Sequence, residues 1–160
     1  MEHASKVRTC FWFEKGGHDA AQEYVTLMPD SRIKAVRENG RPDDPMVVEF
    51  TLADAPMMIL TAGPRHKLTP AASISELTED QDETDRLWAA LTAKGGEAGR
   101  CGWIVDRFGV SWQIEPKRMP DLLASEDPGV VSRVSEAMVQ MEKIDLAGLE
   151  AAAAKEPTHG

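Results

Sequence analysis

The sequence CGWIVDRFGVSWQIEP, residues 101 to 116, decides how the chain folds. It predicts two strands, Cys101–Val105 and Gly109–Pro116, joined by a turn at Asp106–Gly109, because Asp at the first position and Gly at the last are typical of a type I turn. Side chains alternate across a strand, so the faces of the second strand carry Val110, Trp112 and Ile114 on one side and Ser111, Gln113 and Glu115 on the other. We therefore expect one face to pack against helices and the other to line a wet cavity or meet solvent.

The rest of the chain predicts a strand, a helix and then further strands, in two copies. Runs of strand-forming residues end at Gly and Pro, and apolar residues recur at helical spacing between them. In residues 6–62 the expected elements are the strand Lys6–Glu14, the helix His18–Met28 and the strands Ser31–Arg37, Met46–Leu52 and Met57–Thr61. In residues 71–116 they are the strand Ala71–Leu77, the helix Gln81–Ala93 and the hairpin. A duplicated α+β architecture follows, because so short a unit seldom buries its sheet alone.

Residues 117–155 predict a helical extension. Asp127 or one of its neighbours can cap a helix that has Pro128 in its first turn. An apolar stripe follows, formed by Val130, Val131, Val134, Ala137, Met138 and Met141. A last segment runs over residues 144–154, and Glu156–Gly160 is expected to be disordered. The stripe must be buried either on the chain's own sheet or on a partner subunit.

Length and charge indicate one globular domain, residues 1–160, that does not bind nucleic acid. The chain has 160 residues, of which 42% are apolar, enough for a single core. Its 27 acidic and 18 basic residues give a net charge of -9, the opposite of the basic footprint that phosphate binding needs. The two cysteines lack zinc-site spacing, and neither a signal peptide nor an apolar run of about 20 residues is present. The sequence therefore predicts a cytoplasmic protein with reduced thiols and no membrane span.

Several segments, taken together, resemble one protein family. They are CFWFEKGGHDAAQEYVTLMPDSRI, TAGPRHKLTPAASIS, DRLWAAL, CGWIVDRFGVSWQI and MVQMEKIDLAGLEAA. The chain is similar over Lys6–Ala152 to the PhnB-like branch of the vicinal oxygen chelate superfamily, the glyoxalase, bleomycin resistance and dioxygenase superfamily, a branch often labelled demethylubiquinone methyltransferase-like. The resemblance implies two βαβββ modules, residues 6–62 and 71–116, that pair into one cupped mixed sheet, commonly within a homodimer.

The resemblance also implies where a divalent metal would bind. Enzymes of the superfamily hold it with His and Glu side chains from the first and last strands of each module. In this chain those positions fall near Arg8, Thr61, Ala71 and Gln113, none of which is a usual ligand for a first-row metal. We therefore expect no metal and no other cofactor. The sequence also offers no strand with a Gly-rich turn into a helix that would hold a nucleoside cofactor.

Seven side chains are predicted to contact a ligand. Trp12 shares a strand face with Cys10 and Glu14, where it would be either a flat apolar surface for a ligand or part of the core. Gln113 could orient a carbonyl or hydroxyl group. The full set is Cys10, Trp12, Thr61, Ser73, Ser75, Ser111 and Gln113.

Two residues are candidates for a general base. His66 lies in the loop Gly63-Pro64-Arg65-His66-Lys67 and could act as a base at the rim of the pocket, because imidazole is the most frequent general base in enzymes; the alternative is a solvated loop histidine. Glu14 is the other candidate. The sequence thus leaves two classes of function open. The first is a module that binds a small organic molecule without metal, and the second is an enzyme acting on a small carbonyl or hydroxylated compound. A methyltransferase, as relatives are labelled, ranks third.

Overall fold

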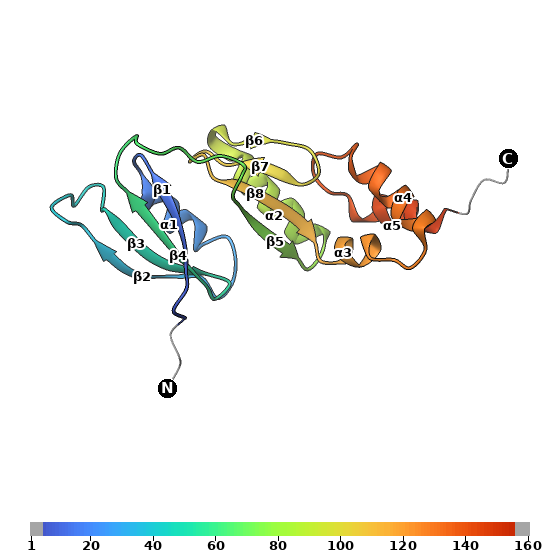
Figure 1. Cartoon of the computed structure of the whole chain (residues 1–160), viewed down its shortest axis with the longest axis horizontal. Coiled ribbons are helices and arrows are strands. Elements are labelled where there is room, and N and C mark those ends of the chain that lie inside the picture. The colour runs from blue at the N-terminus through green and yellow to red at the C-terminus, as the bar shows by residue number, and fades with distance from the viewer. Residues whose placement is uncertain (1–4, 156–160) are drawn as a thin grey trace. The chain divides into compact units, whose positions relative to one another are not determined.

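The computed structural model describes residues 5–155, so the predicted disorder of Glu156–Gly160 lies outside the described residues. The chain divides into two compact units, residues 1–68 and residues 69–160. Each unit contains one sheet of four strands, and the second unit also contains the helical extension. The order of elements along the chain can be followed in Figure 1 by colour.

Unit 1 is a βαβββ unit. Its elements are β1 (Thr9–Phe13), α1 (Gly17–Tyr24), β2 (Arg32–Arg37), β3 (Val47–Leu52) and β4 (Ala55–Thr61). The strand order is β1-β4-β3-β2, and β1 runs parallel to β4 while the other pairs are antiparallel. Helix α1 packs against β3 and β4 (Figure 1). Phe11, Phe13 and Ile59 are buried.

Helix α1 is shorter than the sequence predicts. It ends at Tyr24 rather than at Met28, and residues 25–30 form turns. The amide of Thr26 and its hydroxyl both donate to the carbonyl of Glu23, at 3.0 and 2.7 Å. A hydroxyl that bonds nearby backbone competes with helical hydrogen bonding, which explains the early end. Leu27 and Met28 are nevertheless buried, so their apolar spacing reflected the core and not further helix.

Unit 2 repeats the βαβββ order. Its elements are β5 (Ser73–Thr78), α2 (Gln81–Thr92), the 3-10 turn η1 (Ala93–Gly95), β6 (Glu97–Ala98), β7 (Trp103–Val105) and β8 (Ser111–Pro116). The strand order is β5-β8-β7-β6, with β5 parallel to β8. The predicted α+β class with two βαβββ units is confirmed. The two-residue strand β6 was not predicted, because so short a segment carries no alternating pattern.

The hairpin of β7 and β8 forms as predicted. The amide of Gly109 donates to the carbonyl of Asp106 at 2.9 Å, which closes the turn, and Gly109 has a φ of +90°. A type I turn followed by a left-handed residue is a common three-residue hairpin loop, and Gly adopts that conformation without strain. Ile104, Trp112 and Ile114 are fully buried on the side of α2.

The extension consists of three helices with a core of their own. They are α3 (Arg118–Leu123), α4 (Pro128–Met138) and α5 (Leu146–Ala154). Their shared core is formed by Met119, Leu122, Val134, Ile144 and Leu149. Asp127 caps α4 as predicted, since its carboxylate accepts from the amide of Gly129 at 2.8 Å. Of the apolar stripe, Val134 is thus buried among the three helices, and Val130, Ala137, Met138 and Met141 pack partly buried against this core.

Candidate functional site

Strand alternation gives the sheet of unit 2 one face that α2 does not cover. We call this the Gln113 face; its residues are Ser73, Ser75, Leu77, Trp103, Val105, Ser111, Gln113 and Glu115. On the opposite face, Thr78 of β5 and Thr84 of α2 share a buried hydrogen bond of 2.6 Å between their hydroxyls. The Gln113 face therefore brings together four of the seven predicted ligand-binding residues.

The polar groups of the Gln113 face are only partly satisfied. Gln113 Nε2 donates to Ser73 Oγ at 2.8 Å, a hydrogen bond that joins the side chains of β8 and β5. Ser75 is exposed, whereas Ser111 is 2% exposed and its hydroxyl has no hydrogen-bond partner among the described residues. A buried hydroxyl without a partner costs about 1–3 kcal/mol, so a ligand or a water that pairs with it gains binding energy there.

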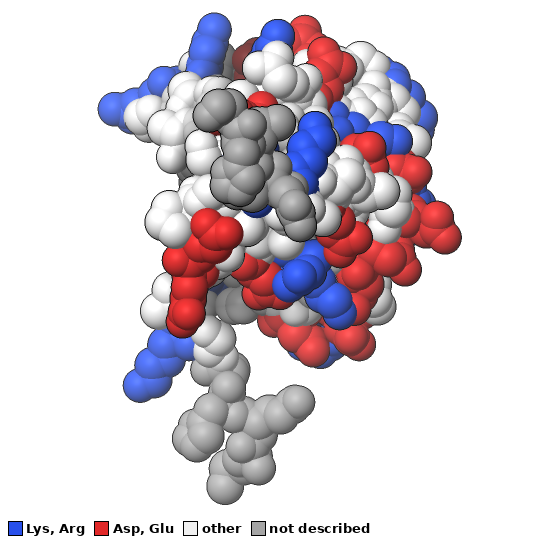
Figure 2. Space-filling model, turned by 90° about the vertical axis from the view of Figure 1, so that its right-hand side faces the viewer, with Lys and Arg blue, Asp and Glu red and all other residues white. Residues whose placement is uncertain are grey.

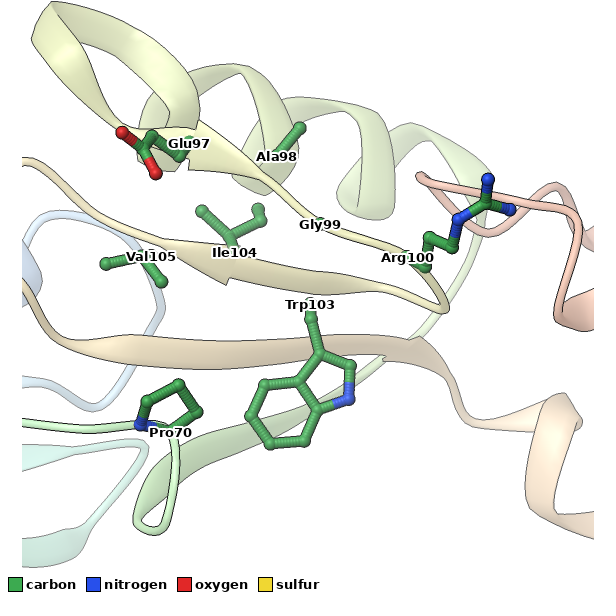
Figure 3. A pocket seen from close by; sticks show the side chains of 8 residues that line it. All are labelled: Pro70, Glu97, Ala98, Gly99, Arg100, Trp103, Ile104 and Val105. Carbon is green, nitrogen blue, oxygen red and sulfur yellow. The ribbon is translucent and has the colours of Figure 1, made fainter.

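A pocket of about 370 Å³ lies at the edge formed by β6 and β7. Figure 3 shows the indole of Trp103 extending from β7 across β8 toward Pro70. Glu97 and Arg100 lie at the two ends of residues 97–100, which also line the pocket. Trp103 is the register partner of Gln113, so an aromatic surface and an amide lie side by side on one face. Pockets of this size, apolar with few polar groups, suit small organic ligands.

Glu115 lies on the same face, next to Gln113 along β8. Burial raises the pKa of Glu115 above its ordinary value. An increase caused by desolvation means that the surroundings of the carboxyl group favour its neutral form. Burial therefore favours the neutral form of Glu115, which can donate a hydrogen bond, more than an exposed site would.

In unit 1 the structure brings two other predicted residues together. Trp12 Nε1 donates to the carbonyl of Gly63 at 2.8 Å, and the Trp12 and His66 rings meet edge to face with centroids 4.7 Å apart. Trp12 is half-buried, and its hydrogen bond to Gly63 holds the start of the loop that carries the exposed His66. The aromatic contact holds the imidazole in one place, as a general base requires.

Cys10 and Glu14 belong to the same region of unit 1 and are both exposed. Partial burial raises the pKa of the Cys10 thiol, and this effect outweighs the opposite influence of Arg8. Cys10 is therefore a weak nucleophile, since the thiolate is the reactive form. Cys101, the other cysteine, belongs to unit 2 and donates through Sγ to the carbonyl of Met138 at 3.6 Å; neither cysteine is in a disulfide.

Thr61, another of the predicted ligand-binding residues, does not share a face of the sheet with Trp12. In the pairing of β1 with β4, Trp12 is the partner of Leu60 and Phe13 is the partner of Thr61. Paired residues point to the same side of the sheet, so Thr61 lies with Phe13 on the side that α1 covers. It is fully buried there, against Gly17, where a Cβ would overlap Thr61 Oγ1. The Thr61 hydroxyl therefore belongs to the packing of α1.

The superfamily's metal does not fit the residues at the implied positions. The guanidinium of Arg8 pairs with Glu49 at 2.9 Å, Thr61 faces the helix, Ala71 has no donor and the Gln113 amide is bonded to Ser73. Residues 5–155 contain no group of three or more His, Cys, Asp or Glu side chains suited to hold an ion. His3 and His159 lie outside the described residues. No chemical step is therefore assigned to a metal.

The glycines between β1 and α1 correct one expectation about a nucleoside cofactor. The structure does contain a strand, Gly16 and Gly17, and then a helix. However, Gly17 is packed against Ile59 and Thr61, and the amide of Gly16 donates to Asp44 Oδ1 at 3.1 Å. The glycines thus serve close packing, and the amide that would face a phosphate is already bonded.

Trp103 and Pro70 are residues of the pocket that sequence reasoning did not select. Trp103 follows the turn Arg100-Cys101-Gly102, and the only signal for it was its alternation with Ile104. The alternation predicts that Trp103 points away from the buried face. Its pairing with Gln113 depends on how β7 is aligned with β8, which the alternation does not predict. Part of the pocket could therefore not be read from the sequence.

The fold defines the class to which the protein belongs: an α+β protein made of two βαβββ units. A family model described as 3-demethylubiquinone-9 3-methyltransferase matches residues 5–115, and the chain belongs to that PhnB-like family. None of the curated proteins matches the chain. In the residues that the structure describes, no helix has the length and apolar character that crossing a membrane requires.

Solved structures share the fold of this chain. A PhnB protein from Bacillus cereus, described as a 3-demethylubiquinone-9 3-methyltransferase, is 24% identical with a TM-score of 0.64, covering 70% of this chain and 99% of its own. PA1353 from Pseudomonas aeruginosa is 19% identical with a TM-score of 0.60, covering 71% and 98%. The fosfomycin resistance protein FosX from Mesorhizobium loti is 15% identical with a TM-score of 0.54, covering 78% and 99%.

Proposed function

We propose that the protein binds a small organic molecule on the Gln113 face of unit 2, without a tightly held metal. The ligand class is a flat, largely apolar molecule that carries a carbonyl or hydroxyl group. The observation that carries the proposal is the pairing of Trp103 with Gln113 beside a pocket of about 370 Å³. Trp103 supplies the apolar surface, and the second N–H of the Gln113 amide is available for an acceptor on the ligand.

The buried hydroxyl of Ser111 supports the same proposal. It lies on the Gln113 face, beside Val105 of the pocket in the register, and lacks a partner among the described residues. A ligand oxygen within reach would pair with it and remove the cost of burying it alone. The arrangement is that of a binding site with an aromatic wall and a few fixed polar groups.

The test is a fluorescence titration with prodan, a naphthalene that carries a ketone, and with 2-dimethylaminonaphthalene, which lacks the ketone. The Trp103→Leu variant should weaken the binding of both probes by about tenfold, because the aromatic wall is lost. The Gln113→Leu variant should weaken prodan by about fivefold and leave the second probe unchanged, because only the ketone accepts a hydrogen bond.

Trp88→Leu is the matched control. Trp88 belongs to α2, is half-buried and is not among the residues that line the pocket. Near-ultraviolet circular dichroism verifies that each variant keeps its tertiary packing. If Trp103→Leu binds both probes as tightly as Trp88→Leu does, the ligand does not bind on this face and the proposal is wrong.

One observation favours a catalytic alternative. The contact of His66 with Trp12 holds an imidazole at the end of the unit 1 sheet, and such a base could remove a proton next to a carbonyl group. Dihydroxyacetone in heavy water tests this, because proton removal exchanges its C–H groups for deuterium. The exchange rate should fall in His66→Gln and, if Glu14 is the base, in Glu14→Gln. Equal rates with and without the protein would exclude this role.

The family's description suggests transfer of a methyl group, for which S-adenosylmethionine is the test. Because the amide of Gly16 already donates to Asp44 and Gly17 is closely packed against Ile59 and Thr61, we expect this compound to leave the melting temperature unchanged. A concentration-dependent increase would instead show binding to the folded state and would favour the methyltransferase alternative.

A homodimer in the cytoplasm completes the proposal. Leu77 is 52% exposed on the Gln113 face at the edge strand β5, and an exposed apolar edge is what a second copy would cover. Free cysteines suit a reducing compartment. Light scattering should give twice 17.5 kDa, and Leu77→Lys should shift the mass toward one copy. A mass of 17.5 kDa for the unmodified chain would refute the dimer.

A further inference from the structure

The turn between β6 and β7 is strained, and this turn places Trp103. Cys101 has a φ of +57° and Gly102 a φ of +81°, so two successive residues are in the left-handed region. That conformation is free of strain for Gly but costs free energy at Cys101, which has a Cβ. Trp103 follows at once, and its amide donates to the carbonyl of Arg100 at 3.1 Å.

The extension supplies the contacts that hold this turn. The amides of Cys101 and Gly102 donate to the carbonyls of Met141 and Glu142 at 2.8 and 2.7 Å. Arg100 Nη1 donates to the carbonyl of Val139 at 3.2 Å, and in Figure 3 the Arg100 side chain points away from Trp103. Two amides of the strained turn thus find their acceptors in the extension.

The same segment of the extension is anchored to α2, away from the pocket. Gln81 Nε2 donates to the carbonyl of Ile144 at 3.0 Å, and Gln81 Oε1 accepts from the amide of Leu146 at 2.9 Å. Lys143 Nζ pairs with Asp85 Oδ1 at 2.6 Å. Gly102 also lies so close to Ile144 that a Cβ would be 3.3 Å from its side chain. Residues 141–146 therefore connect the start of α2 to the turn of the pocket.

We infer that the helical extension is a positioning element of the ligand site: by holding residues 100–102 it fixes Trp103 and so sets the affinity of the pocket. The inference rests on the proposed function. The family model ends at residue 115, so this determinant lies outside the part of the chain that defines the family. Affinity gained in this way comes from preorganisation, because a loose aromatic wall must be ordered when the ligand binds.

Gln81→Ala is the test, since it removes both anchoring hydrogen bonds and touches no residue of the pocket. We expect amide hydrogen exchange at Cys101 and Gly102 to accelerate while the core of the extension stays protected. Prodan and 2-dimethylaminonaphthalene should both bind about fivefold more weakly. Lys143→Ala removes only the ion pair with Asp85, so it should accelerate exchange and weaken probe binding to a smaller extent. This variant replaces Gln81→Ala in the test if Gln81→Ala does not fold.

A rescue variant separates positioning from general loss of structure. Cys101→Gly removes the strain at the left-handed position, so in the Gln81→Ala background it should recover part of the lost probe affinity. Ser132→Ala, which changes only a surface contact of α4 with Glu136, is the matched control and should leave affinity unchanged.

The outcomes distinguish this inference from the proposed function. If exchange at Cys101 and Gly102 accelerates but both probes bind as before, the extension does not set the affinity and the inference is wrong. If Trp103→Leu leaves probe binding unchanged, the proposed site fails first, and the inference fails with it. Loss of binding in both Trp103→Leu and Gln81→Ala, with rescue by Cys101→Gly, supports both.

Discussion

Asp106 shows how one side chain can organise a hairpin. Its Oδ1 accepts from the amides of Phe108 and Val110 at 2.9 and 3.0 Å, and its Oδ2 accepts from Trp112 Nε1 at 2.9 Å. Asp106 is 6% exposed, so these bonds satisfy a carboxylate that burial would otherwise penalise. The interpretation of Asp106 as a structural residue of the turn agrees with these contacts.

Replacing Asp106 should therefore destabilise unit 2 strongly. Asp106→Ala removes the buried carboxylate that accepts from the indole N–H of Trp112 and from the amides of Phe108 and Val110, and losing these three hydrogen bonds should cost about 3 kcal/mol or more in the free energy of unfolding. Urea unfolding measures this cost. Glu126→Ala, an exposed acidic residue, is the control and should change stability little. If Asp106→Ala lowered the free energy of unfolding no more than Glu126→Ala does, Asp106 would not have the structural role proposed for it.

Glu49 should make stability depend on pH. Arg37 and Arg8 both bond its carboxylate and hold the pKa of Glu49 below its ordinary value. A lowered pKa in the folded state adds stability above the ordinary value of 4.5, and that stability disappears as the pH falls through the lowered pKa. Glu49→Gln should thus be less stable than the unmodified chain at pH 7, with the difference vanishing in acid.

Thermal unfolding between pH 3 and about 7 measures this effect. Glu38→Gln is the control, because Glu38 is exposed and forms no ion pair within residues 5–155. A Glu49→Gln deficit that persists unchanged at the lowest pH would show that its cause is packing and not charge.

At the scale of elements, the N-termini of α4 and α5 form a natural comparison. Both have Asp at the N-cap, but the carboxylate of Asp127 accepts from the amide of Gly129, whereas Asp145 makes no capping hydrogen bond. The two helices are also joined by Arg133, which donates to the carbonyls of Ala152 and Ala153 at 3.1 Å each. The end of α5 is thus held by α4.

Asp127→Ala should cost about 1 kcal/mol of stability, and Asp145→Ala distinctly less, because only the first loses a capping bond. Chemical unfolding followed by far-ultraviolet circular dichroism compares the two variants. Equal costs would mean that charge near the helix end, and not the hydrogen bond, accounts for the effect.

At the scale of the whole molecule, the net charge is unevenly divided. Residues 69–160 contain 17 acidic and 9 basic side chains, whereas residues 1–68 contain 10 and 9. Figure 2 shows acidic side chains gathered over the face on the side of the C-terminal helices. Like charges at this density repel one another, and the repulsion weakens in salt.

Raising the salt concentration should therefore stabilise unit 2 more than unit 1. Between about 0.01 and 0.3 M sodium chloride we expect the melting temperature to rise by roughly 2–4 °C, because the Debye length shrinks from about 30 Å to below 10 Å. Hydrogen exchange resolves the two units. If salt protects residues 9–61 as much as residues 73–154, the charge division has no energetic consequence.

The sequence by itself determined the order of the main elements, apart from the two-residue strand β6, and the apolar face of β8. Alternation predicted that Val110, Trp112 and Ile114 would be buried, since successive side chains on a strand point to opposite faces, but it did not predict the burial of Ser111 on the other face. The duplicated order and the cap at Asp127 were likewise local properties, readable from neighbouring residues.

Only the tertiary structure decided which residues meet across the strands. The sequence did not bring Trp103 next to Gln113, did not reveal that Thr61 lies beneath α1 and did not bring residues 141–142 to the turn at Cys101. The physical reason is that register and helix docking depend on packing between distant segments, where a shift of one residue turns a side chain to the other face. The pattern of neighbouring residues in the sequence does not specify strand register or helix docking.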